Sequence, residues 1–311
     1  MSNTTQMLDD ALDRLLTRRL PDMTARRAPN LSETLLSEVI DAGFSRVLAR
    51  EEDGGLGGTL SDAANIAWRC GWHAAPIPIV EMLLLAYLDP AADPATVTLA
   101  HGNPAIAPAS PNIRFVQTGD GMVAAKTAQP FHHISRTPWL RLDGVDSNQN
   151  KTTKAMGALL CAAAMTGAMA RTLEIVTEHA TTRSQFGRPL SKFQAIQHQL
   201  AEATSELTVT QAALSNALAA HDAGLEEALL SHSAKAQAGV AATKIAATAH
   251  QVMGAIGFTE EHVLHHFTKL LWEWRDCWGR QVDCELAIGH AACAAPEGLW
   301  AFITELKKED A

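Results

Sequence analysis

The stretch that decides the fold is Arg183-Ser184-Gln185-Phe186-Gly187-Arg188-Pro189-Leu190, followed by Ser191-Lys192-Phe193-Gln194-Ala195-Ile196-Gln197. Gly accepts left-handed backbone and Pro interrupts a helix, so the pattern predicts a helix end, a turn and a new helix. Arginine can hold a phosphate through two hydrogen bonds, and glutamine can pair with a ribose or an amide. Composition alone fits a charged turn between helices equally well.

A second segment of the same kind is Gln251-Val252-Met253-Gly254-Ala255-Ile256-Gly257-Phe258-Thr259. Two glycines at the end of a helical pattern permit a left-handed cap and a close approach of the backbone to a ligand. An ordinary helix cap accounts for the segment as well when it is considered by itself.

Three zones extend outward from these segments. Residues 153–311 have apolar residues at helical spacing and an alanine-rich run, which predict a C-terminal four-helix bundle. Residues 91–152 contain short apolar runs punctuated by prolines, which predict a reduced central β-domain. Residues 1–90 predict an N-terminal helical domain, with Asn30 and Glu33 as a capping box and a helix pair between Ser61 and Leu88. The predicted fold class is therefore mainly α.

Taken together, these segments resemble a known family. RSQFGRPLSKFQAIQ followed by QVMGAIGFTEEH is similar to the signatures of the acyl-CoA dehydrogenase family, and VLAREEDGGLGG resembles the loop of its N-terminal helical domain. Their order and distances also fit. The resemblance implies an N-terminal helical domain, a central β-domain and a C-terminal four-helix bundle, with FAD, an acyl-CoA substrate and an oligomeric assembly.

The resemblance also implies which residues hold the cofactor. In the family, both signatures reach across a subunit interface to the ADP half of FAD. Carried over, Arg183 faces the pyrophosphate, and Gln251 and Gly254 supply side-chain and backbone contacts from another protomer. The residues expected around the adenosine side are Gln185, Phe186, Phe193 and Gln194.

The sequence departs from the family pattern at the positions of the catalytic base. The family removes the α-proton with a Glu, and the usual Glu-Gly pair falls here on Trp278-Gly279. The alternative position, on the first helix of the bundle, falls near Gly157, with Ala158 at the position of the substrate-contacting Arg. Asp276 is a candidate base close by, although a carboxylate paired with Arg275 or Arg280 explains it better.

The central zone departs from the family too, because the stretches that hold the flavin ring are not recognisable between residues 90 and 150. Three readings follow. The chain is a subunit of a heteromeric dehydrogenase that donates part of the FAD site to a related subunit, as in bacterial steroid side-chain catabolism. Alternatively, it is a self-sufficient homo-oligomeric dehydrogenase with a non-standard base, or a non-redox scaffold that kept the fold without flavin.

Several classes are disfavoured by composition and motifs. A net charge of −9 with no long basic run argues against nucleic-acid binding and against an anionic membrane surface. No stretch reaches the roughly 18 apolar residues of a membrane helix. Five widely spaced cysteines and the lack of a signal peptide predict reduced thiols in the cytoplasm. His262, His265 and His266 form a His-rich helix face without an obvious third type of ligand, so no metal is expected.

Overall fold

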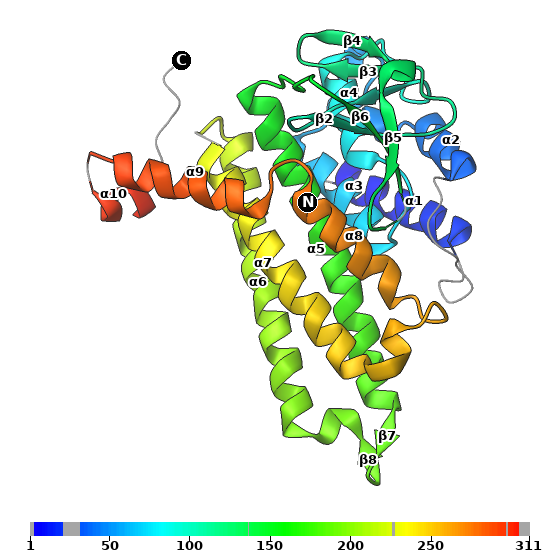
Figure 1. The fold of residues 1–311 in the computed structure, drawn as a ribbon, viewed down its shortest axis with the longest axis vertical. Helices are drawn as coiled ribbons and strands as arrows, with labels where there is room; N and C mark the ends of the chain where they lie inside the picture. The colour runs from blue at the N-terminus through cyan, green and yellow to red at the C-terminus, as the bar shows by residue number, and fades with distance from the viewer. Residues whose placement is uncertain (1–2, 21–31, 136, 226–227, 297, 305–311) are drawn as a thin grey trace.

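The computed structural model describes residues 3–20, 32–135, 137–225, 228–296 and 298–304. The chain is mainly helical, as predicted, with the N-terminal helices and the strands at one end and a long helical bundle extending from them (Figure 1). The N-terminal helices are α1 (Asn3–Arg19), α2 (Glu33–Asp41), α3 (Leu60–Trp72) and α4 (Ile79–Leu88). The boundaries of the three domains stay a prediction.

The start of α2 differs from the expectation. Ser32 is the N-cap, and its hydroxyl accepts a hydrogen bond from the backbone N–H of Leu35 at 3.3 Å. Glu33 is thus the first residue of the helix rather than the third, which the predicted capping box requires. Asn30 lies outside the described residues. The predicted helix pair is confirmed as α3 and α4, which the Pro76–Pro78 turn separates.

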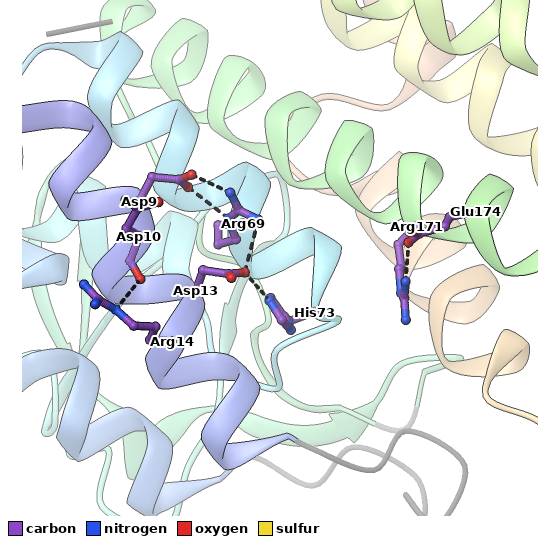
Figure 2. Close-up of polar contacts among 8 residues, drawn as sticks. All are labelled: Asp9, Asp10, Asp13, Arg14, Arg69, His73, Arg171 and Glu174. Atoms are coloured by element: carbon purple, nitrogen blue, oxygen red, sulfur yellow. Dashed lines mark hydrogen bonds and ion pairs between the residues drawn. The ribbon is translucent and has the colours of Figure 1, made fainter. Parts of the chain in front are cut away.

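Helix α1 is fixed on α3 by a polar cluster (Figure 2). Arg69 donates from Nε to Asp9 at 2.9 Å and from Nη1 to Asp13 at 3.1 Å, and Asp13 also contacts His73 Nε2 at 2.8 Å. Burial lowers the pKa of His73 more strongly than Asp13 raises it. The cluster therefore joins two helices around one half-buried guanidinium.

The central strands form two small sheets. The strands are β1 (Val97–Leu99), β2 (Ala105–Pro108), β3 (Phe115–Thr118), β4 (Gly121–Ala124), β5 (Gln129–His132) and β6 (Pro138–Leu142). One sheet has the order β1-β3-β4 and the other β2-β6-β5, and only the β1–β3 pair is parallel. In the second sheet, Trp139 stands opposite Phe131 and is buried. This sheet thereby supplies one wall of the pocket described below.

The bundle consists, within the described residues, of three long helices and the shorter α8, which agrees with the predicted helical C-terminal region. They are α5 (Lys151–Thr182), α6 (Gln194–Asp222), α7 (Ala228–Met253) and α8 (Leu264–Asp276), followed by α9 (Gln281–Ala294) and α10 (Leu299–Thr304). A short hairpin of β7 (Ser184–Gln185) and β8 (Arg188–Pro189) joins α5 to α6 at the end of the bundle remote from the sheets (Figure 1).

Helix α5 is the central element. It packs closely against α3 and α7, and its length and apolar composition suffice to cross a membrane, which the sequence analysis did not anticipate. However, 78% of its apolar window is buried inside the protein. The apolar character of α5 is therefore used in packing, as in the core helix of a bundle.

Candidate functional site

The two signature segments meet at a hollow at the remote end of the bundle. Helix α5 ends at Thr182, and Arg183 leaves it with extended backbone. Helix α7 ends at Met253, and Gly254 follows with a left-handed φ of +61°. Both ends border one open hollow of about 730 Å³, within the usual range for small-molecule sites. Its lining is His179, Arg183, Gln185, Leu190, Ile196, Gln251, Val252, Met253, Gly254, Ala255, Ile256 and Thr259.

Four of the seven predicted cofactor residues line this hollow, namely Arg183, Gln185, Gln251 and Gly254. The other three lie beside it. Phe186 is 91% exposed on the hairpin, with its ring edge-on to Phe193 at a centroid separation of 6.2 Å. Gln194 is the exposed first residue of α6. The hollow thus combines a guanidinium and two side-chain amides with the backbone at the C-terminal end of α7. The guanidinium and the amide N–H groups are donors that fit a diphosphate-bearing ligand.

The hollow contains a titratable residue that the sequence analysis missed. His179 lies in the last turn of α5, four residues before Arg183, which caps the helix, and both residues line the hollow. Partial burial and the positive charge of Arg183 lower the pKa of His179. The H-x-x-x-R spacing was the available signal, but it became meaningful only once the hollow was known.

A second pocket lies near the two predicted positions of the base, between α4, α5, α8 and β6. Its free volume is only about 50 Å³. Aromatic side chains occupy much of its wall, and two carboxylates, Glu81 and Glu273, also line it. Since small-molecule sites measure about 300 to 1,000 Å³, this pocket is too small for an acyl chain as it stands.

Trp278 fills much of the space in this pocket with its side chain. Its φ is +53°, a left-handed conformation that is rare for a bulky residue, and its side chain is buried. The indole Nε1 donates a hydrogen bond to Glu81 Oε1 at 2.8 Å. On another side, the ring lies against Gly157 so closely that an added β-carbon there overlaps it. The two positions that the family resemblance implies for the base therefore lie against one another, and neither bears a carboxylate.

Glu81 is the second residue that the sequence analysis missed. It is buried on α4, and burial raises its pKa to about 7 despite the hydrogen bond from Trp278. The buried His101 has Nε2 at 3.8 Å from Glu81 Oε1, beyond hydrogen-bond distance, and burial lowers its pKa to about 3. Glu81 therefore faces a neutral imidazole and an indole N–H. A glutamate in the apolar run of α4 was its only sequence signal.

Buried polar contacts hold the segment that carries Trp278. Lys235 on α7 is fully buried and donates from Nζ to the carbonyls of Arg275 at 2.9 Å and Gly279 at 2.8 Å. Glu273 accepts hydrogen bonds from Thr137 at 2.7 Å and from Trp139 Nε1 at 3.0 Å. The end of α8 is thus tied both to the bundle and to the second sheet.

The candidate base Asp276 is not brought to this pocket. It is the last residue of α8, its side chain is exposed, and its Oδ1 lies 3.4 Å from Arg275 Nε. The helix ends there, so the irregular backbone re-aims Trp278 and leaves Asp276 facing solvent. Asp276 therefore lies on the surface beside Arg275 and does not line the pocket, and its role in proton abstraction stays a prediction.

The histidine-rich face does not form a metal site in the described part of the chain. His262 accepts a hydrogen bond from Leu264 N at 3.1 Å, and the ring of His265 lies 4.0 Å from that of His266. Within the described residues, no group of three His, Cys, Asp or Glu side chains is arranged to hold a metal ion.

Comparison with known proteins places these features in a family. The profile of the acyl-CoA dehydrogenase C-terminal domain matches residues 148–271. Acyl-CoA dehydrogenase IpdE2 of Mycobacterium tuberculosis is 30% identical over 249 residues, 73% of this chain and 76% of the relative. The IpdE2 of Mycolicibacterium smegmatis is 28% identical over 78% of this chain and 81% of its own.

Solved structures share the fold. A chain of the ChsE4-ChsE5 complex from Mycobacterium tuberculosis matches with a TM-score of 0.78 at 19% identity, covering 95% of this chain and 99% of its own. Butyryl-CoA dehydrogenase from Megasphaera elsdenii matches with a TM-score of 0.75 at 16% identity, covering 94% and 98%. The chain belongs to the acyl-CoA dehydrogenase family, a family of flavin-dependent oxidoreductases.

Proposed function

We propose that this chain is a subunit of a heteromeric acyl-CoA dehydrogenase. In this proposal it contributes the hollow at Arg183 to a FAD whose ring is held by a related subunit, and the acyl-CoA thioester binds beside that ring. The observation that carries the proposal is the contrast between two sites. The dinucleotide half-site is open and furnished with donors, whereas the pocket at the usual base positions is filled.

The residues of the hollow fit the ADP half of FAD. Arg183 offers a fork of N–H donors for the diphosphate, and Gln185 and Gln251 offer amides for the ribose and adenine. Gly254 has no side chain to obstruct a close approach of its backbone. When bound, FAD supplies the acceptor for the hydride that leaves the β-carbon of the acyl group. This chain binds and orients the dinucleotide.

The self-sufficient alternative needs a base and room for a substrate. Glu81 is the carboxylate nearest to the usual base position among the described contacts, but its Oε1 is engaged by Trp278 Nε1. The small free volume also leaves too little room for an acyl chain beside Glu81. The scaffold alternative does not explain why Arg183 and Gln251 converge on one hollow. Both alternatives are therefore less well supported.

Two further comparisons favour a heteromeric assembly that acts on large lipid-derived thioesters. A structural neighbour, ChsE4-ChsE5, is described as a complex, and another neighbour is described as a steroid ACAD, with a TM-score of 0.76. A substrate from lipid or steroid catabolism and a homologous partner are accordingly part of the proposal.

The test is the visible absorbance spectrum of the chain purified alone and after co-expression with a neighbouring dehydrogenase-like gene. We expect a colourless lone protein and a yellow complex that contains both chains. Arg183→Ala should lower the flavin content of the complex, whereas Arg141→Ala, on the exposed side of β6, should not. Stoichiometric flavin in the lone chain contradicts the subunit role and favours a homo-oligomeric enzyme. A complex that stays colourless supports the scaffold.

A further inference from the structure

We infer that His179 is an additional binding residue of the hollow and that it takes up a proton when a diphosphate-bearing ligand binds. This inference rests on the proposed function of the hollow as a dinucleotide half-site. It adds a residue to that site and makes binding depend on pH. The argument uses the position of His179, the charges around it and the end of the helix that carries it.

His179 is placed next to the residue expected to bind the diphosphate. His179 and Arg183 lie one helical turn apart at the C-terminal end of α5, and both line the hollow. The backbone N–H of Arg183 donates to the carbonyl of His179 at 2.8 Å, which fixes the two residues relative to one another. An anion held by Arg183 therefore lies within the part of the hollow that His179 borders.

The surroundings disfavour the protonated form of His179 in the absence of an anion. Its pKa is lowered by burial and by Arg183, and its positive neighbours are Arg183 itself and, when protonated, His262, which interacts with it from the segment before α8. The nearby carboxylates in the sequence are exposed. They are Glu178, at the preceding position of α5, and Glu260 and Glu261, which follow Thr259. Helix α7 and strand β7 present uncharged groups to the hollow, namely Gln251 and Gln185.

A bound diphosphate changes the electrostatic environment of His179 so that the protonated form becomes favoured. Its negative charge offsets that of Arg183 and favours the imidazolium, so the pKa of His179 rises on binding. The negative end of the α5 dipole also favours a cation in the last helical turn, and His179 is the basic residue there. The imidazolium then donates a charge-assisted hydrogen bond to a phosphate oxygen. Because binding takes up a proton, affinity increases as the pH falls through the range in which free His179 is neutral.

The experiment is calorimetric titration of ADP into the full-length chain at pH 7, in two buffers of different protonation enthalpy. ADP is the probe because it carries the diphosphate and adenosine without the flavin ring. We expect a buffer-dependent enthalpy that reports proton uptake. In His179→Gln the protein's share of the buffer dependence should disappear, which leaves only the ionisation of the terminal phosphate of ADP. The affinity at pH 6 should fall about tenfold while that at pH 8.5 changes little.

The controls separate this inference from the proposal on which it rests. His198→Gln changes an exposed histidine of α6 that contacts Glu202 and should behave as the wild type. Loss of ADP binding in Arg183→Ala, with unchanged proton uptake in His179→Gln, overturns the role of His179 and leaves the half-site intact. Proton uptake that vanishes in His262→Gln instead also overturns it. A wild-type chain that binds no ADP contradicts both the half-site and the role of His179.

Discussion

The indole of Trp278 occupies the space that a side chain at Gly157 needs. One residue lies at the start of the bundle on α5 and the other just beyond α8, and the family resemblance implies that these are the two positions at which related enzymes carry their base. Here a large ring at one position is accommodated because the other has no side chain. The large ring of Trp278 and the lack of a side chain at Gly157 are thus two parts of one packing solution.

Gly157→Ala tests this packing directly. The added methyl overlaps the indole, so we expect a loss of about 1 to 3 kcal/mol in the free energy of unfolding. Combining it with Trp278→Ala should remove most of that loss, which gives a coupling energy measurable by chemical denaturation of the two single variants and the double variant. Gly289→Ala on α9 is the matched control, because nothing lies within 4 Å of its added β-carbon. Additive effects of Gly157→Ala and Trp278→Ala contradict the packing described.

Glu81 makes stability depend on pH. Its pKa rises from an ordinary 4.5 in the unfolded chain to about 7 in the folded protein, so between these values the folded state binds more protons. The free energy of unfolding should therefore fall as the pH rises from about 4.5 to 7, and the contribution of Glu81 should be constant above that.

Glu81→Gln keeps an acceptor for Trp278 Nε1 and removes the titration. We expect the difference in unfolding free energy between this variant and the wild type to grow by a few kcal/mol across that pH window, in favour of the variant. Denaturant unfolding at several pH values measures it. Glu285→Gln, an exposed carboxylate on α9, should leave the slope of the wild type unchanged. An identical slope in Glu81→Gln would show that Glu81 does not titrate there.

Lys235 holds the turn that presents Trp278. Lys235→Met keeps most of the side-chain volume but leaves the carbonyls of Arg275 and Gly279 without their donor, and we expect a loss of about 2 to 4 kcal/mol. The indole N–H resonance of Trp278 should also shift or broaden. Lys244→Met on the same helix removes an exposed ion pair with Glu206 and should cost less than about 1 kcal/mol. Equal losses in the two variants rule out a special role for Lys235.

Arg183 should dominate flavin affinity in whichever assembly contains the cofactor. Removing a guanidinium that bonds to a phosphate costs about 1.5 to 3 kcal/mol, so Arg183→Ala is expected to raise the FAD dissociation constant by roughly 10- to 150-fold. Fluorescence titration of the apoprotein complex measures this change. The assignment of Arg183 fails if the variant binds FAD as tightly as the wild type.

The sequence predicted the parts of the molecule that depend on neighbours in the chain. The helices, the hairpin at Gly187 and Pro189 and the cap at Gly254 follow from spacing and from the conformational limits of Gly and Pro. The family resemblance assigned both Arg183 and Gln251 to the ADP half of FAD, with Gln251 coming from another protomer. That the two residues line one hollow of the same chain was not expected, because no local signal joins α5 to α7.

The closed pocket could not be predicted in the same way. It depends on contacts between distant positions, such as Glu81 with Trp278 and Lys235 with Gly279. A left-handed Trp is also contrary to the ordinary preference of a bulky residue, so a continuing helix was the natural expectation for this segment. Lys235 among alanines was a visible signal, since a lone cation in an apolar helix needs buried acceptors.

Helix α5 also sets the distance between the closed pocket and the hollow. It runs without interruption from the residue beneath Trp278 to the edge of the hollow, and at 1.5 Å per residue the distance from Gly157 to Arg183 along its axis is about 39 Å. That span exceeds the length of an extended flavin dinucleotide. A cofactor anchored at Arg183 would therefore have its reactive ring outside the reach of this chain's own closed pocket, and this separation supports the proposal that the ring is held by a related subunit.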